Sequence, residues 1–118
     1  THLGEGTATL TMTVREDMLN GFDICHGGFI TTLADSAFAF ACNSRNVVTV
    51  AAGLTVDFLA PAHGGDVLTA AASETSRAGR TGVYDIVVSN QHGRRVALVR
   101  GRSHSLTGRT VLPAKESA

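Results

Sequence analysis

Apolar and polar residues alternate near the start of the chain. In residues 6–14, GTATLTMTV, threonines occupy one set of alternate positions and apolar side chains occupy most of the other. This period of two places the two kinds of side chain on opposite faces, which is typical of a half-buried β-strand. Residues 15–25 carry charges and the turn-forming pair Asn20-Gly21, so they predict a loop.

The pattern changes from Gly27 to about Cys42, where the sequence GGFITTLADSAFAFAC predicts one long α-helix. Glycines open the segment, no proline or glycine interrupts it after Gly28, and the polar residues 43–46 end it. Asp35 is the only charged residue within it, and apolar side chains cover most of its circumference. Helices that are apolar on nearly every side are buried helices, so we expect this one at the centre of the fold.

Four further segments contain β-branched runs or alternation and predict strands, namely 47–61, 66–77, 81–90 and 94–106. The last two breaks between them, 78–80 and 90–93, are short enough for antiparallel hairpins. The expected fold is α+β, with a five-stranded antiparallel sheet wrapped around one long central helix, in a single domain over residues 1–118. One sheet leaves a flank of the helix uncovered, and a symmetric second copy of the chain is the usual cover.

Composition and charge argue against several classes of function. Lys and Arg together number 10, Asp and Glu also number 10, and tryptophan is absent, so neither charge nor base stacking favours nucleic acid. No apolar run approaches the ~20 residues of a membrane span, and the first residues show no signal peptide. Cys25 and Cys42 are too far apart along the predicted helix to pair within a chain, and free thiols suit the cytoplasm. The five histidines show no metal-ligand spacing, so we expect no metal site.

Asp35 is the first candidate for chemistry. It lies about two turns inside the apolar helix, too deep to cap its start, and no Lys or Arg stands three or four residues away. An ionised carboxylate without a partner in apolar surroundings is costly, and such groups often have a function. The alternative is a solvated aspartate on one polar stripe of the helix, beside Thr31, Thr32 and Ser36. Composition alone leaves both interpretations open.

The motif His26-Gly27-Gly28 stands where the helix begins. Backbone N–H groups in the first turn of a helix have no intrahelical acceptor, and glycines let a ligand approach them closely. Such a helix start can bind a polarised carbonyl or a developing oxyanion. The alternative is that His26 is an ordinary loop residue and the glycines only permit close packing. Asn20 likewise is either a site residue or half of an ordinary Asn-Gly turn. Cys25 and His26 make a poor nucleophile–base pair, because adjacent side chains in a loop usually point apart.

Several segments together resemble a known family. The run NGFDICHGGFITTLADSAFAFACNS, followed by VDFLAPAHGGDVLTA, TGVYDIVVSNQ and VALVRGRSH, resembles the PaaI-type hotdog-fold acyl-CoA thioesterases of phenylacetate degradation. The resemblance extends from about Thr9 to His104, with Asn-Gly, His-Gly-Gly and the later Asp in register. It implies a hotdog fold, homodimers joined into tetramers, and active sites at the dimer interface. It also implies hydrolysis of acyl-CoA without a cofactor, with aryl or hydroxylated phenylacetyl groups as the acyl part.

The resemblance implies roles for individual residues. Asp35 matches the catalytic carboxylate, as nucleophile or as general base on water, and the Gly27 N–H matches the donor that polarises the thioester carbonyl. Asn20 and His26 match the loop that shapes the site and helps to position water or thioester. Some relatives place a Ser or Thr of the next strand near the water, and Thr55 is the nearest hydroxyl here. Further contacts with substrate or CoA are expected from Gly28, Thr55, Arg80, Thr81 and Gly82.

Two other functions are alternatives to thioester hydrolysis. A hotdog-fold dehydratase or hydratase would use a His-Asp pair with the His as base over the acyl chain, whereas His26 stands in front of Gly-Gly. A non-enzymatic acyl-CoA binding module would keep the fold and the arginine-bearing loops but would not need a carboxylate in the helix. Asp35 therefore favours an enzyme. The expected partners are an acyl-CoA substrate and further copies of the chain, without nucleic acid or membrane.

Overall fold

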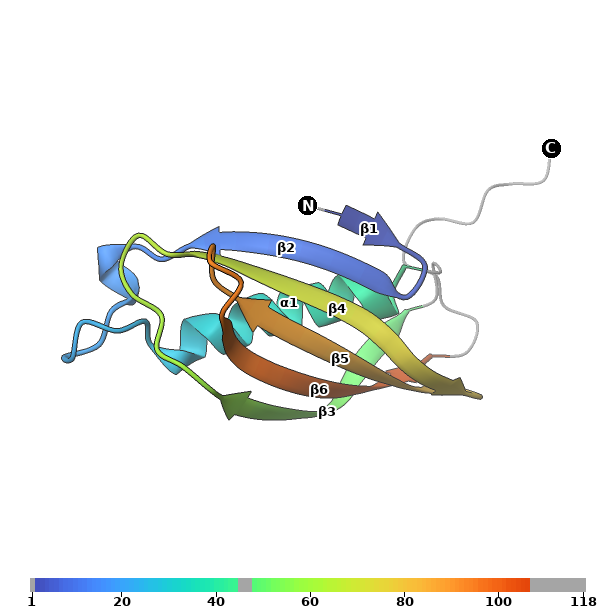
Figure 1. Cartoon of the computed structure of the whole chain (residues 1–118). Coiled ribbons are helices and arrows are strands. Elements are labelled where there is room, and N and C mark those ends of the chain that lie inside the picture. The colour runs from blue at the N-terminus through green and yellow to red at the C-terminus, as the bar shows by residue number, and fades with distance from the viewer. Residues whose placement is uncertain (1, 45–47, 107–118) are drawn as a thin grey trace.

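The fold consists of one long helix and an antiparallel sheet (Figure 1). The structure is a computed structural model, and it describes residues 2–44 and 48–106. In chain order the elements are β1 (His2–Gly4), β2 (Thr7–Thr13), the 3₁₀ turn η1 (Glu16–Met18), α1 (Gly27–Cys42), β3 (Thr49–Phe58), β4 (Val67–Ala78), β5 (Thr81–Ser89) and β6 (Arg95–Ser105). The helix has the predicted bounds, and the five predicted strands are all confirmed.

The sheet contains one strand more than predicted, in the order β1-β2-β4-β5-β6-β3. The additional strand, β1, has 3 residues and pairs with β2. So short a segment cannot show a period of two, which is why the sequence pattern misses it. The strand predicted over 47–61 ends at Phe58, ahead of Pro61, which has no N–H to donate to a ladder. Its predicted start at residue 47 lies outside the described residues.

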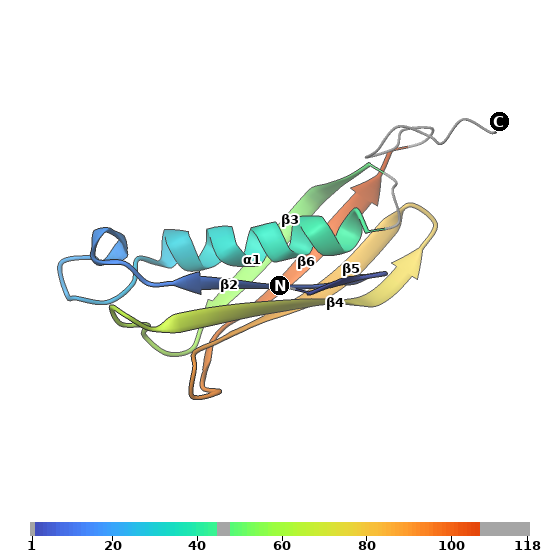
Figure 2. The ribbon, with the colours of Figure 1, turned by 90° about the horizontal axis from the view of Figure 1, so that it is seen from above.

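Helix α1 lies along one face of the curved sheet, and the core fills the space between them (Figure 2). The helix residues buried there are Ile30, Leu33, Ala34, Ala37, Phe38, Ala41 and Cys42. Gly101 on β6 allows the close approach, because a Cβ there would stand 2.8 Å from the buried ring of Phe38. Within the described ranges, no helix combines the length and the apolar composition that crossing a bilayer requires.

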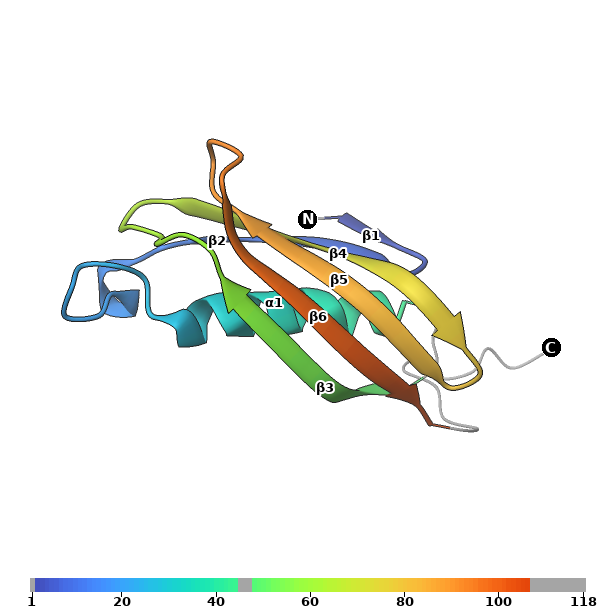
Figure 3. The same ribbon diagram turned by 60° about the horizontal axis from the view of Figure 1, so that its bottom comes forward.

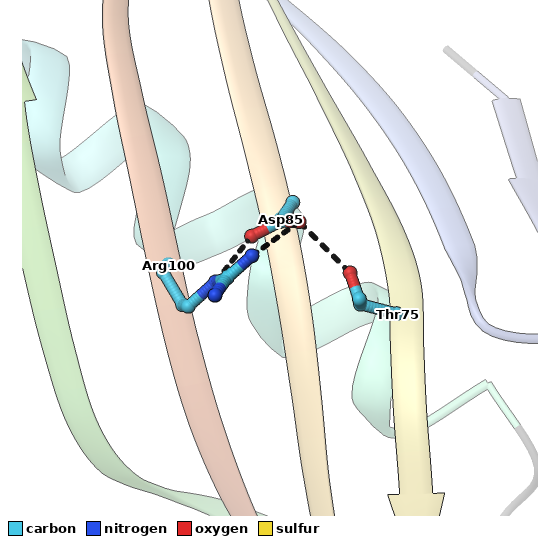
Figure 4. A network of polar contacts seen from close by, with 3 residues as sticks. All are labelled: Thr75, Asp85 and Arg100. Carbon is cyan, nitrogen blue, oxygen red and sulfur yellow. Dashed lines mark hydrogen bonds and ion pairs between the residues drawn. The ribbon is translucent and has the colours of Figure 1, made fainter.

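The opposite face of the sheet carries several charged and hydroxyl side chains, and some of them link three strands (Figure 4). Arg100 on β6 donates to Asp85 on β5 twice, from Nε to Oδ1 at 2.7 Å and from Nη2 to Oδ2 at 3.0 Å. Thr75 on β4 donates from Oγ1 to Oδ2 of the same carboxylate at 2.9 Å. The hydrogen bond from Arg100 is the main reason why the pKa of Asp85 lies below its ordinary value.

Two apolar surfaces stay open on a single chain. In the described part of the chain β3 ends the sheet (Figure 3). Its exposed side chains include Val50, Leu54 and Phe58. On the helix, Phe29 and Phe40 are 38% and 53% exposed. Long apolar edge strands and apolar surface patches are features that soluble monomers avoid. One chain therefore buries only part of a helix that the sequence predicts to be apolar on nearly every side.

Candidate active site at the start of helix α1

The start of α1 presents one uncommitted backbone donor. His26 is the N-cap residue, and its Nδ1 accepts a hydrogen bond from the Gly28 N–H at 3.1 Å. The His26 carbonyl accepts from the Phe29 N–H at 3.0 Å. Among the described residues, no group accepts a hydrogen bond from the Gly27 N–H. His26 thus satisfies the two donors that follow and leaves the Gly27 N–H available, in the partial positive field of the helix N-terminus.

An aromatic ring explains the glycine at position 27. A Cβ on Gly27 would stand 2.9 Å from Cζ of Phe58 and 3.3 Å from Cε1, which is closer than real side chains pack. The tip of the Phe58 ring therefore lies where a side chain of residue 27 would be. The ring is nevertheless 55% exposed. Gly27 permits the last residue of β3 to touch the first residue of α1.

A groove with a volume of about 580 Å³ lies beside Gly27. The loop before the helix forms one wall, and the end of β3 with the turn after it forms the other. The lining residues are Asn20, Ile24, Cys25, Gly27, Ile30, Phe58, Leu59, Ala60, Pro61 and Ala62. The Cys25 N–H donates to the Ala62 carbonyl at 2.7 Å and ties the two walls together. A mostly apolar groove with a backbone donor at its edge fits a ligand whose carbonyl is joined to an apolar group.

Asn20 shapes the loop that forms the first wall. Its Oδ1 accepts hydrogen bonds from the N–H groups of Phe22 at 2.8 Å and Ile24 at 3.4 Å. Its backbone N–H donates to the Ile24 carbonyl at 2.8 Å, and Asp23 within this turn has a positive φ of 59°. The two interpretations of Asn20 are therefore compatible, because the residue closes a tight turn and also lines the groove.

Asp35 lies on a part of the helix that the groove does not reach. It is exposed, on a stripe that also contains Gly28, Thr32 and Ala39. The rise of an α-helix places it about 12 Å along the axis from Gly27. One thioester carbonyl cannot contact both residues at hydrogen-bonding distance. Within a single chain, Asp35 matches the alternative interpretation, a solvated aspartate on a polar stripe.

Cys25 forms no nucleophile pair with His26. The cysteine is buried, and its Sγ donates to the His26 carbonyl at 3.6 Å instead of contacting the imidazole. Burial raises the pKa of the Cys25 thiol, which keeps the sulfur protonated and poorly nucleophilic. Within the described ranges, no three or more His, Cys, Asp or Glu side chains gather in an arrangement that could hold a metal ion.

Thr55 does not line the groove of its own chain. It lines a hollow of about 480 Å³ together with Asp57, Asp85 and Arg100, on the polar face of the sheet. Successive side chains of a strand point to opposite faces, and the neighbouring Val56 packs against the core on the helix side. A hydroxyl on the far face cannot reach water at the helix start of the same chain. The expected contact of Thr55 with water or substrate stays a prediction, and it is one that a single chain does not provide.

The predicted contacts Arg80, Thr81 and Gly82 lie at the other end of the helix, in the hairpin between β4 and β5 (Figure 3). Gly82 helps to line a polar hollow of about 200 Å³ next to Cys42, the last residue of α1. Arg80 and Thr81 are exposed, whereas Gly82 is buried. A Cβ on Gly82 would stand 2.7 Å from Oγ of Ser103, so packing accounts for this glycine.

Phe58 and the turn after it are the groove residues that the sequence patterns miss. They are distant in the chain from the His-Gly-Gly motif and meet it only through the fold. The sequence contains only a weak signal for these groove residues. The apolar pair Phe58-Leu59 stands just ahead of Pro61, where a strand must end, and large apolar side chains at such an exposed end often contact a ligand or a partner.

Comparison with known proteins identifies the family. Residues 22–97 match the model of the Thioesterase superfamily. The acyl-coenzyme A thioesterase PaaI of Escherichia coli strain K12 is 51% identical over 106 residues, which is 90% of this chain and 76% of that protein. The chain belongs to the thioesterase superfamily, and the prediction of an enzyme is confirmed.

Solved structures agree with this result. The E. coli PaaI protein from the phenylacetic acid degradation operon matches with a TM-score of 0.87 at 52% identity, over 90% of this chain and 76% of that one. The TT0310 protein of Thermus thermophilus matches with a TM-score of 0.85 at 39% identity, over 89% and 88%. A hypothetical thioesterase protein of Streptococcus pneumoniae TIGR4, solved with coenzyme A, matches with a TM-score of 0.87 at 25% identity, over 92% and 88%. The predicted hotdog fold and the resemblance to PaaI-type proteins are confirmed.

Proposed function

We propose that the chain hydrolyses acyl-CoA thioesters to the free acid and CoA, and that it prefers aryl or hydroxylated phenylacetyl groups. The observation that carries the proposal is the Gly27 N–H, a helix-start donor with no acceptor among the described residues, at the edge of an apolar groove. The E. coli relative is an acyl-coenzyme A thioesterase, and the S. pneumoniae structure contains coenzyme A. The phenylacetic acid degradation operon that encodes the E. coli relative supports an aryl substrate.

In this proposal the helix start acts on the thioester carbonyl. The Gly27 N–H donates a hydrogen bond to the carbonyl oxygen, and the helix dipole adds partial positive charge at the same place. Negative charge on that oxygen grows as a nucleophile adds to the carbon. The donor therefore binds the transition state more strongly than the substrate, which is the condition for catalysis. The apolar walls lower the local dielectric constant and strengthen the interaction further.

Asp35 supplies the carboxylate for the attack. It either adds to the carbonyl carbon, forming an anhydride that water then cleaves, or accepts a proton from an attacking water. In both routes the C–S bond breaks, the sulfur leaves with the electron pair and takes up a proton, and the oxygen of water ends in the acid. Thioester and water become acid and thiol, so the reaction requires no cofactor.

Gly27 and Asp35 can act on one carbonyl if they come from different chains. They are about 12 Å apart along their own helix, too far for one substrate atom. The open edge of β3 and the exposed flank of α1 offer two adjacent apolar surfaces for a second copy. A two-fold axis would bring the helix start of one chain to Asp35 of the other and repeat the site. We therefore propose an obligate homodimer, with tetramers formed from two such dimers.

His26 favours hydrolysis over the dehydratase alternative. A general base needs an unprotonated ring nitrogen within reach of the substrate proton. The Nδ1 of His26 is instead used to cap α1 through the Gly28 N–H. In the proposed mechanism His26 and Gly28 position the first turn of the helix so that the Gly27 N–H remains available for the substrate.

Arg80 and Thr81 remain candidates for contacts with CoA, but in the site of a neighbouring chain. Their hairpin lies next to the last residue of α1, about 22 Å along the axis from Gly27. In a partner related by a two-fold axis perpendicular to the helix, α1 runs in the opposite direction. That reversal moves the partner's hairpin toward the groove described above.

A thiol-release assay tests the proposed reaction. We expect the parent protein to hydrolyse phenylacetyl-CoA and hydroxyphenylacetyl-CoA with a higher kcat/KM than aliphatic acyl-CoA esters. Asp35→Asn should lower kcat by about 10²–10⁴-fold, because an amide neither attacks a thioester nor accepts a proton from water. Asp57→Asn is the matched control, since it removes an exposed carboxylate on the polar face of the sheet. An Asp35→Asn variant that keeps more than about a tenth of the parent rate contradicts the role of Asp35.

Mixed dimers test the shared site. Chains with Asp35→Asn and chains with Gly27→Pro are each expected to be inactive alone. When they are co-expressed in equal amounts, half of the dimers combine one chain of each kind, and each of these has one intact site. About a quarter of the parent activity should therefore return if two chains share each site. No recovery, or an active species of 12.2 kDa by light scattering, would overturn the shared site.

A further inference from the structure

Phe58 is in an unusual position for a large aromatic side chain. Its backbone is fixed at the end of β3, where the next N–H, that of Leu59, donates to the Val96 carbonyl at 2.8 Å. The ring tip touches Gly27, yet 55% of the residue stays exposed. Within a single chain, burial therefore does not explain the ring, because an aliphatic side chain would cover Gly27 at a smaller exposed apolar area.

The rest of the groove differs from Phe58 in chemistry. Its other apolar side chains are aliphatic or sulfur-containing, among them Ile24, Ile30 and Leu59. Of the described residues that line the groove, Phe58 alone is aromatic. The single aromatic wall thus adjoins the residue that carries the uncommitted N–H. A ligand whose carbonyl is bound by the Gly27 N–H can therefore place its acyl group beside this ring.

Distances indicate which acyl groups benefit from the ring. A carbonyl oxygen bound to an N–H lies about 2.9 Å from the nitrogen. Aromatic pairs attract most when their centroids are about 4.5–7 Å apart, in offset or edge-to-face arrangements. An aryl ring joined to the carbonyl through one carbon can reach that range from a ring that touches Gly27. A linear alkyl chain gains only the nonspecific contact that any apolar wall provides.

We propose that Phe58 is a specificity-determining residue that favours arylacyl over alkylacyl thioesters. The inference rests on the proposed thioester hydrolysis and deepens it, since it assigns the recognition of the acyl group to one side chain. Phe58 is not assigned a part in bond breaking. Its replacement should therefore change the preference between substrates more than it changes the reaction itself.

The test compares phenylacetyl-CoA with octanoyl-CoA, whose acyl groups contain the same number of carbon atoms. Phe58→Leu should lower the ratio of kcat/KM for the aryl over the alkyl substrate by about two- to ten-fold, the factor that corresponds to one aromatic pair. Phe58→Tyr keeps the ring and should keep the ratio. Phe58→Ile provides a second aliphatic variant suited to a strand, in case the leucine variant folds poorly.

Phe40→Leu is the matched control. Phe40 is 53% exposed, close to the value for Phe58, but it lies near the end of α1 and does not line the groove. Any effect of this control on assembly should act on both substrates equally and leave the ratio unchanged. Equal losses on both substrates in Phe58→Leu and Phe58→Ile overturn this inference and leave the proposed function standing. If the parent protein hydrolyses neither substrate, the proposed function fails and the inference falls with it.

Discussion

The two ends of helix α1 differ in how fully their backbone groups are capped by hydrogen bonds. At the C-terminal end, Asn43 Nδ2 donates to the carbonyls of Ala39 at 2.8 Å and Thr49 at 3.1 Å, and its Oδ1 accepts from the Thr49 N–H at 2.8 Å. Ser44 Oγ donates to the Ala41 carbonyl at 2.7 Å. At the N-terminal end, His26 satisfies neighbouring donors and the Gly27 N–H is left over.

The difference separates stability from chemistry. At the closed end, burial raises the pKa of the Cys42 thiol to about 11, so this sulfur stays protonated and unreactive at neutral pH. The hollow there is small and polar, whereas the groove at the open end is larger and mostly apolar. Polar groups that already bond to each other have little hydrogen-bonding capacity left for a ligand. A donor without an acceptor, beside apolar walls, keeps its full capacity to bind one. Substitutions at the two ends should therefore have different consequences.

Among substitutions at the two ends of the helix, those at position 27 have the largest expected effect, and they test the open end directly. Gly27→Pro should lower kcat by about 10²–10³-fold, because proline has no N–H and the loss of one oxyanion donor has an effect of that size. Proline is well tolerated at the first position of a helix, so α1 should persist by circular dichroism. Gly27→Ala adds the same Cβ against Phe58 but keeps the N–H, and it should lose far less activity. Equal losses in the two variants would show that crowding, rather than the donor, controls the rate.

Asn43→Ala tests the closed end. Removal of this side chain leaves the Ala39 carbonyl and both backbone groups of Thr49 without their side-chain partner. We expect the free energy of unfolding to fall by about 1–3 kcal/mol, measured by urea denaturation. The kcat per folded active site should remain at the parent value. A lower kcat with unchanged stability would mean that the closed end takes part in the reaction, and the contrast between the ends would fail.

Asp85→Asn gives the smallest expected effect and serves as a reference remote from both ends. The Arg100–Asp85 pair is largely exposed and screened by solvent, so its loss should lower stability less than Asn43→Ala does and leave kcat unchanged. The pKa of Asp85 is lowered in the folded protein. Its contribution is therefore present above the unfolded pKa of about 3.9 and disappears as pH falls through the lower folded pKa. The stability difference between parent and variant should narrow in strong acid, and a difference that grows there would contradict the ion pair.

Local sequence patterns predict the helix better than its surroundings. Its bounds follow from an apolar segment that begins at two glycines and ends at a run of polar residues. Gly27 is noticeable because it belongs to the glycine pair at the helix start, and Asp35 because it is the only charged residue in the helix. Thr55 shows the limit of such patterns. Nearly every residue of β3 is small or apolar, so the sequence does not reveal which side chains face the helix, and a β-bulge between Ala51 and Gly53 shifts the register.

The contact between Gly27 and Phe58 could not be predicted for a different reason. It joins two residues that come together only when β3 has paired with β6 and α1 has packed on the sheet. A glycine in a sequence indicates freedom of the backbone or a close approach, but it does not name the neighbour that approaches. The role of His26 is a similar case, since a cap is visible only once the Nδ1 and the Gly28 N–H have positions.

The spacing between Gly27 and Asp35 sets the register of the proposed dimer. A two-fold axis repeats every contact with the two chains exchanged. If Gly27 of one chain faces the partner's Asp35, then Asp35 of that chain must face the partner's Gly27. The axis must then pass the helix midway between them, near Thr31, whose hydroxyl already donates to the Gly27 carbonyl at 2.9 Å. The rise per residue of the helix therefore determines the distance between the two sites of the proposed dimer, which is about 12 Å along the axis. One residue inserted between Gly27 and Asp35 would turn the carboxylate by about 100° and misalign both sites at once.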